Sequence, residues 1–178
     1  MNKILLEGQE LDLSEVKFPV LIHGEENTGA SLYTISFAAN LYGKGSSIVF
    51  LCGFQQAAEE FTKQIGGIGD SQVDIFTKDQ FDKFKTILAS NSEDTIIFIK
   101  NIELFGEEVL ELVTDKENVV LSGDINKCEF INILFQKQFH TKILFSEMSG
   151  VDLPALRQYE GYFETASLLG KTTVKISG

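Results

Sequence analysis

Short apolar runs alternate with amphipathic stretches along most of this chain. Runs such as FPVLIH (18–23), SSIVFLC (46–52) and TIIFI (95–99) are largely apolar, which is typical of strands buried on both faces of a sheet. Between such runs, apolar residues recur at helical spacing. We predict strands at 3–6, 18–23, 46–52, 71–76, 95–99, 118–121 and 141–145, and helices at 31–42, 54–65, after a Thr77 cap, 103–113 and 126–138.

This alternation predicts an α/β fold, in which a mainly parallel sheet lies between two layers of helices as a three-layer αβα sandwich. The strand at 18–23 should be central. The glycine-containing loop that follows it should lie at the carboxyl end of the sheet, where such folds bind ligands.

Both ends of the chain depart from this rhythm. Residues 1–17 are expected to form an edge segment, with a turn and an edge strand at 7–13. Strand-like runs at 159–165 and 171–176, with a turn near Leu169 and Gly170, predict a C-terminal antiparallel hairpin. Neither a linker nor an internal repeat divides the sequence, so we expect one domain over 1–178.

Charge and composition narrow the choice of partners. The chain has 26 acidic and 15 basic residues, a net charge of −11, so direct binding of nucleic acid is not expected. The acidity is explained by solubility or by a basic partner. No membrane-length apolar segment or signal peptide is visible, and we expect a cytoplasmic protein. Cys52 and Cys128 read as reduced core thiols, and no metal-ligand spacing occurs.

The loop after the central strand carries the strongest motif. Residues 24–31 read GEENTGAS, which fits the phosphate-loop pattern G-x-x-x-x-G-K-[ST] except for one residue. In such loops, glycines let backbone N–H groups face phosphate oxygens, and the helix N-terminus favours anions. The candidate loop consists of Gly24, Glu25, Glu26, Asn27, Thr28, Gly29, Ala30 and Ser31.

The charged groups needed for nucleotide chemistry are replaced at two positions. Ala30 stands where the pattern has a lysine that reaches the terminal phosphates, and Glu25 and Glu26 add negative charge. The TIIFI strand should end in an acid that holds magnesium, but Lys100 and Asn101 follow it. Both changes disfavour binding of a triphosphate with its metal.

From these motifs, the chain resembles the RecA-like branch of the P-loop NTPases, with the AAA+ branch as an alternative. Gly24, Gly29, Ser31 and the TIIFI strand carry the resemblance, together with Ser122-Gly123-Asp124 and the closing hairpin. The resemblance gives Ser122 and Asp124 the place of a polar sensor. It implies a nucleotide-binding fold, whereas the departures at Ala30 and Lys100 imply loss of ATP hydrolysis.

We therefore expect a catalytically inactive relative, without catalytic residues, metal or cofactor, that acts as a structural or regulatory subunit. Its partner would be an active ATPase relative or further copies of itself. The alternative is a protein that still binds ATP or GTP with Mg²⁺, or another phosphate ligand, through loop N–H groups and Ser31. The single arginine, Arg157, is either an intersubunit residue or a surface residue.

Four further alternatives stay open. If the strands at 18–23 and 95–99 are neighbours, Lys100 could form an ion pair with Glu25 or Glu26. His23 is either a ligand or switch residue or a hydrogen-bonded structural histidine. Asp124 is either sensor-like or a helix N-cap. The apolar residues of 126–138 either contact a partner or are buried.

Overall fold

In the computed structural model, the described residues are 4–6, 13–67, 72–149, 151–165 and 168–173. Within these residues, nine strands form one sheet in the order β1-β9-β8-β7-β2-β6-β5-β3-β4. The strands are β1 (Ile4–Leu6), β2 (Val20–His23), β3 (Ile48–Cys52), β4 (Val73–Thr77), β5 (Ile96–Lys100), β6 (Val119–Gly123), β7 (Thr141–Leu144), β8 (Glu160–Glu164) and β9 (Leu168–Thr173).

The sheet is parallel from β4 to β7 and becomes antiparallel at β8. Strand β2 pairs with β6 on one side and β7 on the other, so it is central, as predicted. Strand β8 runs antiparallel to both β7 and β9, which confirms the C-terminal hairpin. The predicted turn at Leu169 and Gly170 is wrong, because both residues lie within β9, where Gly170 pairs with Phe163. Residues 174–176 lie outside the described part.

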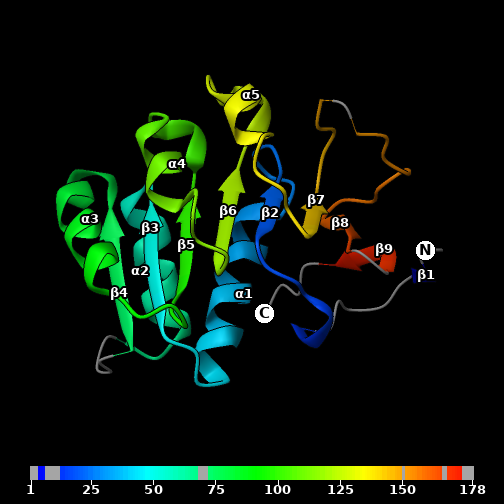
Figure 1. Ribbon diagram of the computed structural model, residues 1–178. Coiled ribbons are helices and arrows are strands. Elements are labelled where there is room, and N and C mark those ends of the chain that lie inside the picture. Colours follow the sequence, from blue (N-terminus) through cyan, green and yellow to red (C-terminus); the bar gives the residue numbers. More distant parts are fainter. Residues whose placement is uncertain (1–3, 7–12, 68–71, 150, 166–167, 174–178) are drawn as a thin grey trace.

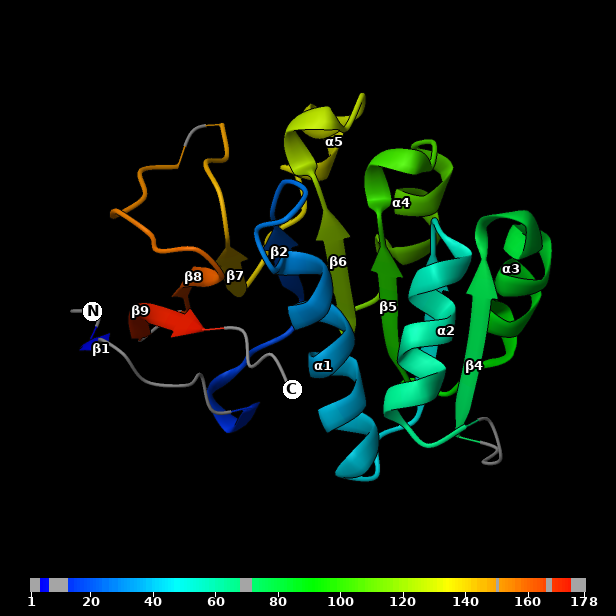
Figure 2. The same ribbon diagram turned by 180° about the vertical axis from the view of Figure 1, so that it is seen from behind.

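Helices cover both faces of the parallel part (Figures 1 and 2). Helices α1 (Ala30–Gly43) and α2 (Gln55–Gln64) pack on one face, around buried residues such as Phe37 and Phe61. Helices α3 (Phe81–Ser90), α4 (Glu108–Val113) and α5 (Ile131–Leu134) cover the other face, around residues such as Phe84, Val109 and Leu134. The predicted α/β architecture is thus confirmed at the level of a mostly parallel sheet with helices.

Two predicted helices are shorter than expected. The segment 103–113 begins as a 3₁₀ turn at Ile102–Leu104, and α4 starts only at Glu108. The helix expected at 126–138 is largely wrong, since the structure has a 3₁₀ turn at Ile125–Lys127 and the four-residue α5. There the Asn126 side chain donates to the Glu147 carbonyl and accepts from the Ser149 N–H, which holds the chain in a tertiary contact.

Other predictions for the flanking residues are settled only in part. Strand β1 is the edge strand, pairing in parallel with β9, as expected for residues 4–6 of the N-terminal segment. Most of the turn and edge strand expected at 7–13 lies outside the described residues. Cys52 and Cys128 are free and buried, as predicted.

Candidate functional site

A cavity of about 540 Å³ opens at the carboxyl ends of β2, β5 and β6. Its walls come from the loop after β2, the first turn of α1, the segment after β5 and the segment after β6. Its volume lies within the range of about 300–1,000 Å³ typical of ligand pockets. The cavity brings together the two sequence motifs, the glycine loop and the residues that follow the TIIFI strand.

The glycine loop bends sharply and then enters α1 directly. Asn27 and Gly29 have positive φ angles of 62° and 93°, in the left-handed region that glycine adopts without strain. The Gly24 N–H donates to the Gly123 carbonyl at 3.2 Å, and the Glu25 N–H donates to Ser146 Oγ at 3.0 Å. The first two N–H groups of the loop are therefore already bound to the protein.

Ala30 and Ser31 differ sharply in their surroundings. Ala30 is buried and its methyl group packs so closely on Gly24 that a Cβ atom there would overlap it, as well as Thr28 Oγ1. Ser31 is exposed in the first turn of α1. Glu25, Glu26 and the loop tip are exposed too, so the negative charges of this loop face the cavity mouth and solvent.

Lys100 lies at the last position of β5 and is only 4% exposed. It pairs in register with Cys52 of β3 and Ser122 of β6, so these three side chains share the α1 face of the sheet. Its ammonium donates to Asn101 Oδ1 at 3.2 Å. Burial lowers the pKa of Lys100 below its usual value, while nearby Cys52 and Glu103 oppose that shift.

The proposed ion pair between Lys100 and the loop glutamates is wrong in the described residues. Strand β6 separates β5 from β2, so the two strands are not neighbours as that hypothesis required. No contact within 4.0 Å joins Lys100 to Glu25 or Glu26 there, and the carboxylate that acts on its ammonium is Glu103. The acidic group that favours the charged form of Lys100 is therefore Glu103, which follows the same strand, and not a glutamate of the glycine loop.

Glu103 is a further residue of the site, which the sequence marked only as the expected start of a helix at 103–113. Its Oε2 accepts a hydrogen bond from the Asp124 N–H at 3.2 Å. Burial raises its pKa, and the nearby Asp124 carboxylate acts in the same direction. The available sequence signal was position: Glu103 follows the predicted strand at 95–99 by four residues, where side chains reach the carboxyl edge of the sheet.

Asp124 is 8% exposed and lines the same cavity as Lys100 and Glu103. It occupies the N-cap position of the 3₁₀ turn Ile125–Lys127, but its side chain makes no capping hydrogen bond. Its Oδ2 lies 3.6 Å from the Lys127 ammonium, whereas its buried Oδ1 has no hydrogen-bond partner. Ser122, also predicted as sensor-like, is buried beside it and lines the cavity.

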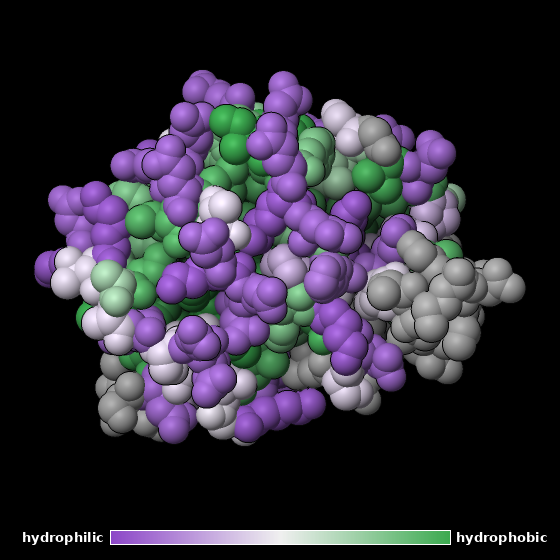
Figure 3. Space-filling model, in the orientation of Figure 1, coloured by the Kyte–Doolittle hydropathy of each residue, from purple (hydrophilic) through white to green (hydrophobic). Residues whose placement is uncertain are grey.

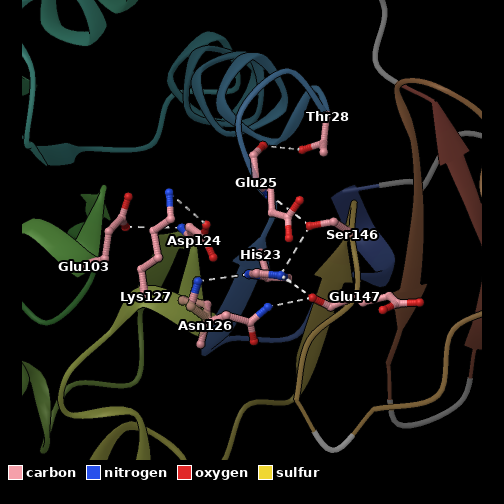
Figure 4. A network of polar contacts seen from close by, with 10 residues as sticks. His23, Glu25, Thr28, Glu103, Asp124, Asn126, Lys127, Ser146 and Glu147 are labelled. Atoms are coloured by element: carbon pink, nitrogen blue, oxygen red, sulfur yellow. Dashed lines mark hydrogen bonds and ion pairs between the residues drawn. The ribbon is translucent and has the colours of Figure 1, made fainter.

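His23 is the centre of a polar network behind the loop (Figure 4). Its Nδ1 accepts the Ile125 N–H at 2.9 Å, so Nε2 carries the proton and donates to the Glu147 carbonyl at 2.9 Å. Nε2 also lies 3.3 Å from Ser146 Oγ, which holds the Glu25 N–H. Through these contacts His23 connects the segments that follow β2, β6 and β7. They favour the interpretation of His23 as a hydrogen-bonded structural histidine.

Arg157 lies apart from these groups. It is exposed in the connection between β7 and β8, where its N–H donates to Glu160 Oε1 at 3.2 Å. It does not line the cavity, although the nearby Tyr159 does. The structure therefore does not join Arg157 to the site within one chain, and an intersubunit role stays a hypothesis.

The charged groups of the cavity are mainly acidic. Four carboxylates line it, from Glu25, Glu26, Glu103 and Asp124, against the ammonium groups of Lys100 and Lys127. In the described part of the chain, no group of three or more His, Cys, Asp or Glu side chains is arranged to hold a metal ion. The helices described there are too short or too polar to cross a membrane.

In comparisons with known proteins, no family model matches the sequence and no curated protein is significantly similar to it. The class that the fold defines is therefore that of an α/β protein with a mostly parallel sheet and a polar cavity at the carboxyl ends of its central strands.

Proposed function

We propose that this protein is a catalytically inactive P-loop NTPase-like domain of the RecA-like type, which acts as a structural or regulatory subunit of a larger assembly. The main support for this proposal is Lys100, which is buried and lines the cavity together with the glycine loop. It lies at the end of a strand, at the position where enzymes that hydrolyse nucleotides need an acid to bind the metal. A buried ammonium at that position opposes the binding of Mg²⁺.

The loop itself gives a second, independent support. A nucleotide-binding loop needs N–H groups directed at phosphate and a cation to neutralise it. Here Gly24 and Glu25 direct their N–H groups to Gly123 and Ser146, and Ala30 supplies no charge. Two exposed glutamates, Glu25 and Glu26, would lie close to any bound phosphate.

The layout of the sheet around the glycine loop also supports the proposal. The glycine loop joins the central strand β2 to α1, and the connection crosses to β3 over β6 and β5. A scaffold of this shape without the charges suits a structural subunit, because such a role depends on shape rather than on chemistry.

Isothermal titration with Mg-ATP and Mg-GTP, combined with a phosphate-release assay, tests this proposal. We expect neither turnover nor binding in the range of about 1 μM, which would correspond to about −8 kcal/mol. Nucleotide binding tighter than this would favour the alternative, a protein that binds phosphate through an altered loop. Light scattering on the purified chain then shows whether it assembles with itself, which separates a homo-oligomer from a subunit that needs another protein.

A further inference from the structure

The Asp124 carboxylate has an acceptor that the protein does not use. Its side chain is 10% exposed, and Oδ1 has no hydrogen-bond partner among the described residues. A buried charged oxygen without a partner is costly, and native proteins usually satisfy such groups. Oδ1 itself is covered in this structure, but Asp124 lines the cavity, so a donor that enters the cavity can meet its carboxylate group.

Lys127 does not fill this role. Its ammonium lies 3.6 Å from Oδ2, whereas a charge-assisted hydrogen bond is about 2.7–2.9 Å long. The Lys127 side chain is 67% exposed, so it can move away from the carboxylate into water at little cost. The Lys127 ammonium therefore interacts only weakly with the Asp124 carboxylate and can be displaced by a donor that forms a shorter hydrogen bond.

The charges around the cavity favour a cation. Lys100 and Glu103 act on each other at the base of the cavity, which leaves Asp124, Glu25 and Glu26 against Lys127 alone. Glu25 and Glu26 are exposed at the mouth, where they attract a basic group from solution. The whole chain carries a net charge of −11, which acts in the same direction.

The mouth also offers apolar surface. Phe54 is 55% exposed and Leu32 is 39% exposed, and both line the cavity. A guanidinium group combines several N–H donors in a rigid plane with a face that stacks on aromatic rings, whereas an ammonium group is a compact, strongly hydrated charge without a flat face. An acid, an aromatic ring and two glutamates at the mouth thus match arginine better than lysine.

We propose that this cavity receives an arginine side chain from a basic segment of a partner protein, with the guanidinium donating to Asp124. The inference rests on the proposed function, because it supplies the partner that a structural or regulatory subunit needs. A second copy of this chain is a poorer occupant, since it carries the same net charge of −11 and a single arginine.

The test uses a fluorescein-labelled peptide in which arginine alternates with glycine, titrated with the full chain at about 0.15 M salt and followed by anisotropy. A peptide with citrulline, the uncharged analogue, in place of arginine is the control ligand. We expect the citrulline peptide to bind at least about tenfold more weakly, because the charged hydrogen bond is lost.

Three variants locate the binding. Asp124→Asn should weaken the arginine complex by about tenfold or more, whereas Glu111→Gln, the same charge change on the exposed side of α4, should leave it within about twofold. Lys127→Gln, at an exposed residue, should keep or increase the affinity, because it removes a competing cation. Thermal unfolding of each variant checks that it is folded.

Each other result overturns the inference. If the arginine peptide does not bind, or the citrulline peptide binds equally well, no guanidinium site is present. Equal weakening by Asp124→Asn and Glu111→Gln would mean diffuse attraction to an acidic surface. A weaker complex with Lys127→Gln would mean that the peptide is not competing for Asp124. These failures leave the proposed function intact, whereas tight Mg-ATP binding would overturn that function whatever the peptide does.

Discussion

Glu103 Oε2 accepts a hydrogen bond from the Asp124 N–H at 3.2 Å, which ties the segment after β5 to the end of β6. The contact depends on Gly123, whose φ of 149° lies in a region that other residues rarely adopt. A Cβ atom at Gly123 would overlap the Glu103 carboxylate and press on the Ile102 N–H. The base of the cavity is therefore built around a residue without a side chain.

Replacing this glycine should destabilise the protein. Gly123→Ala imposes both backbone strain and a steric conflict with Glu103, so we expect a loss of about 1–3 kcal/mol in the free energy of unfolding. Urea denaturation followed by circular dichroism measures the loss. Gly43→Ala is the matched control, because Gly43 ends α1 with open space around its Cβ position and should be neutral or slightly stabilising. Equal effects of the two substitutions would contradict this account of Gly123.

Removing the buried amine of Lys100 should have the opposite effect. Lys100→Met keeps the long side chain but removes a charge that is 4% exposed and whose pKa burial lowers, so we expect the protein to gain stability at about pH 7. Lys63→Met, an exposed change in α2, should alter stability little. A Lys100→Met variant less stable than the wild type at this pH would show that the ammonium is well satisfied.

The gain from Lys100→Met should also depend on pH. Because burial lowers the pKa of Lys100 in the folded protein, the unfolded chain binds more protons in the window below the ordinary value of 10.5. Wild-type stability therefore rises with pH through that window, and the advantage of the variant shrinks. Cys52 and Cys128, whose pKa values burial raises from 9.0 to about 11, make stability fall above about pH 9 in both proteins, so the difference in stability between the two proteins is the quantity to follow. A difference that stays constant as the pH rises towards 10.5 would contradict the lowered pKa.

His23 offers a test of the network in Figure 4. In His23→Leu, the buried Ile125 N–H loses its partner, at a cost of about 1–3 kcal/mol, whereas the Glu147 carbonyl keeps the Asn126 side chain as a donor. His140→Leu, at an exposed position, provides the comparison. Guanidinium chloride titration should show the loss for His23 alone, and similar midpoints for both variants would argue against a structural role.

The strands could be predicted because a strand that is buried on both faces of the sheet appears in the sequence as a short continuous apolar run. Strand β3 was expected at 46–52 and forms at Ile48–Cys52, and β5 was expected at 95–99 and forms at Ile96–Lys100. The prediction ended β5 one residue too early, because Lys100 is charged yet buried and no local pattern marks such a residue. A hydrophobic run indicates that a strand is present, but it does not show which charged residue is buried at its end.

Helices and strand order were harder to predict. The run 126–138 is apolar nearly all round, which favoured a long helix. In the structure only Ile131–Leu134 forms an α-helix, and Asn126, at the expected start, makes tertiary contacts instead. In the structure Leu134 is buried, whereas Ile133 and Phe135 are each 43% exposed, so this segment is only partly core. Figure 3 shows other apolar residues emerging among the polar ones that dominate this face.

Most of the site depends on contacts between strands that are distant in sequence. The loop at 24–31 and Lys100 were identified because each follows an apolar run, which is a local signal. The insertion of β6 between β2 and β5 is not local, and it explains why Lys100 acts with Glu103 rather than with the loop glutamates. The roles of Glu103 and Ser146 likewise follow from register and backbone geometry that single residues do not encode.

If the proposed function is right, placing a lysine in the loop at Ala30 should not produce hydrolysis. In Ala30→Lys the Lys100 ammonium still lies where a metal-binding acid is needed, and Glu25 and Glu26 still face the phosphate position, so we expect no Mg²⁺-dependent phosphate release. Ala89→Lys, on the exposed side of α3, controls for the added charge.

Adding Lys100→Asp to Ala30→Lys also removes the buried ammonium group from the proposed metal position. The double variant should bind Mg-ATP at least about tenfold more tightly than Ala30→Lys alone, because an acid replaces a buried cation beside the metal position. Substituting Lys63→Asp for Lys100→Asp makes the same charge change on exposed α2 and should bring no such gain. Turnover by the single variant would mean that Lys100 does not block the metal, and the inactive assignment would then depend on Ala30 alone.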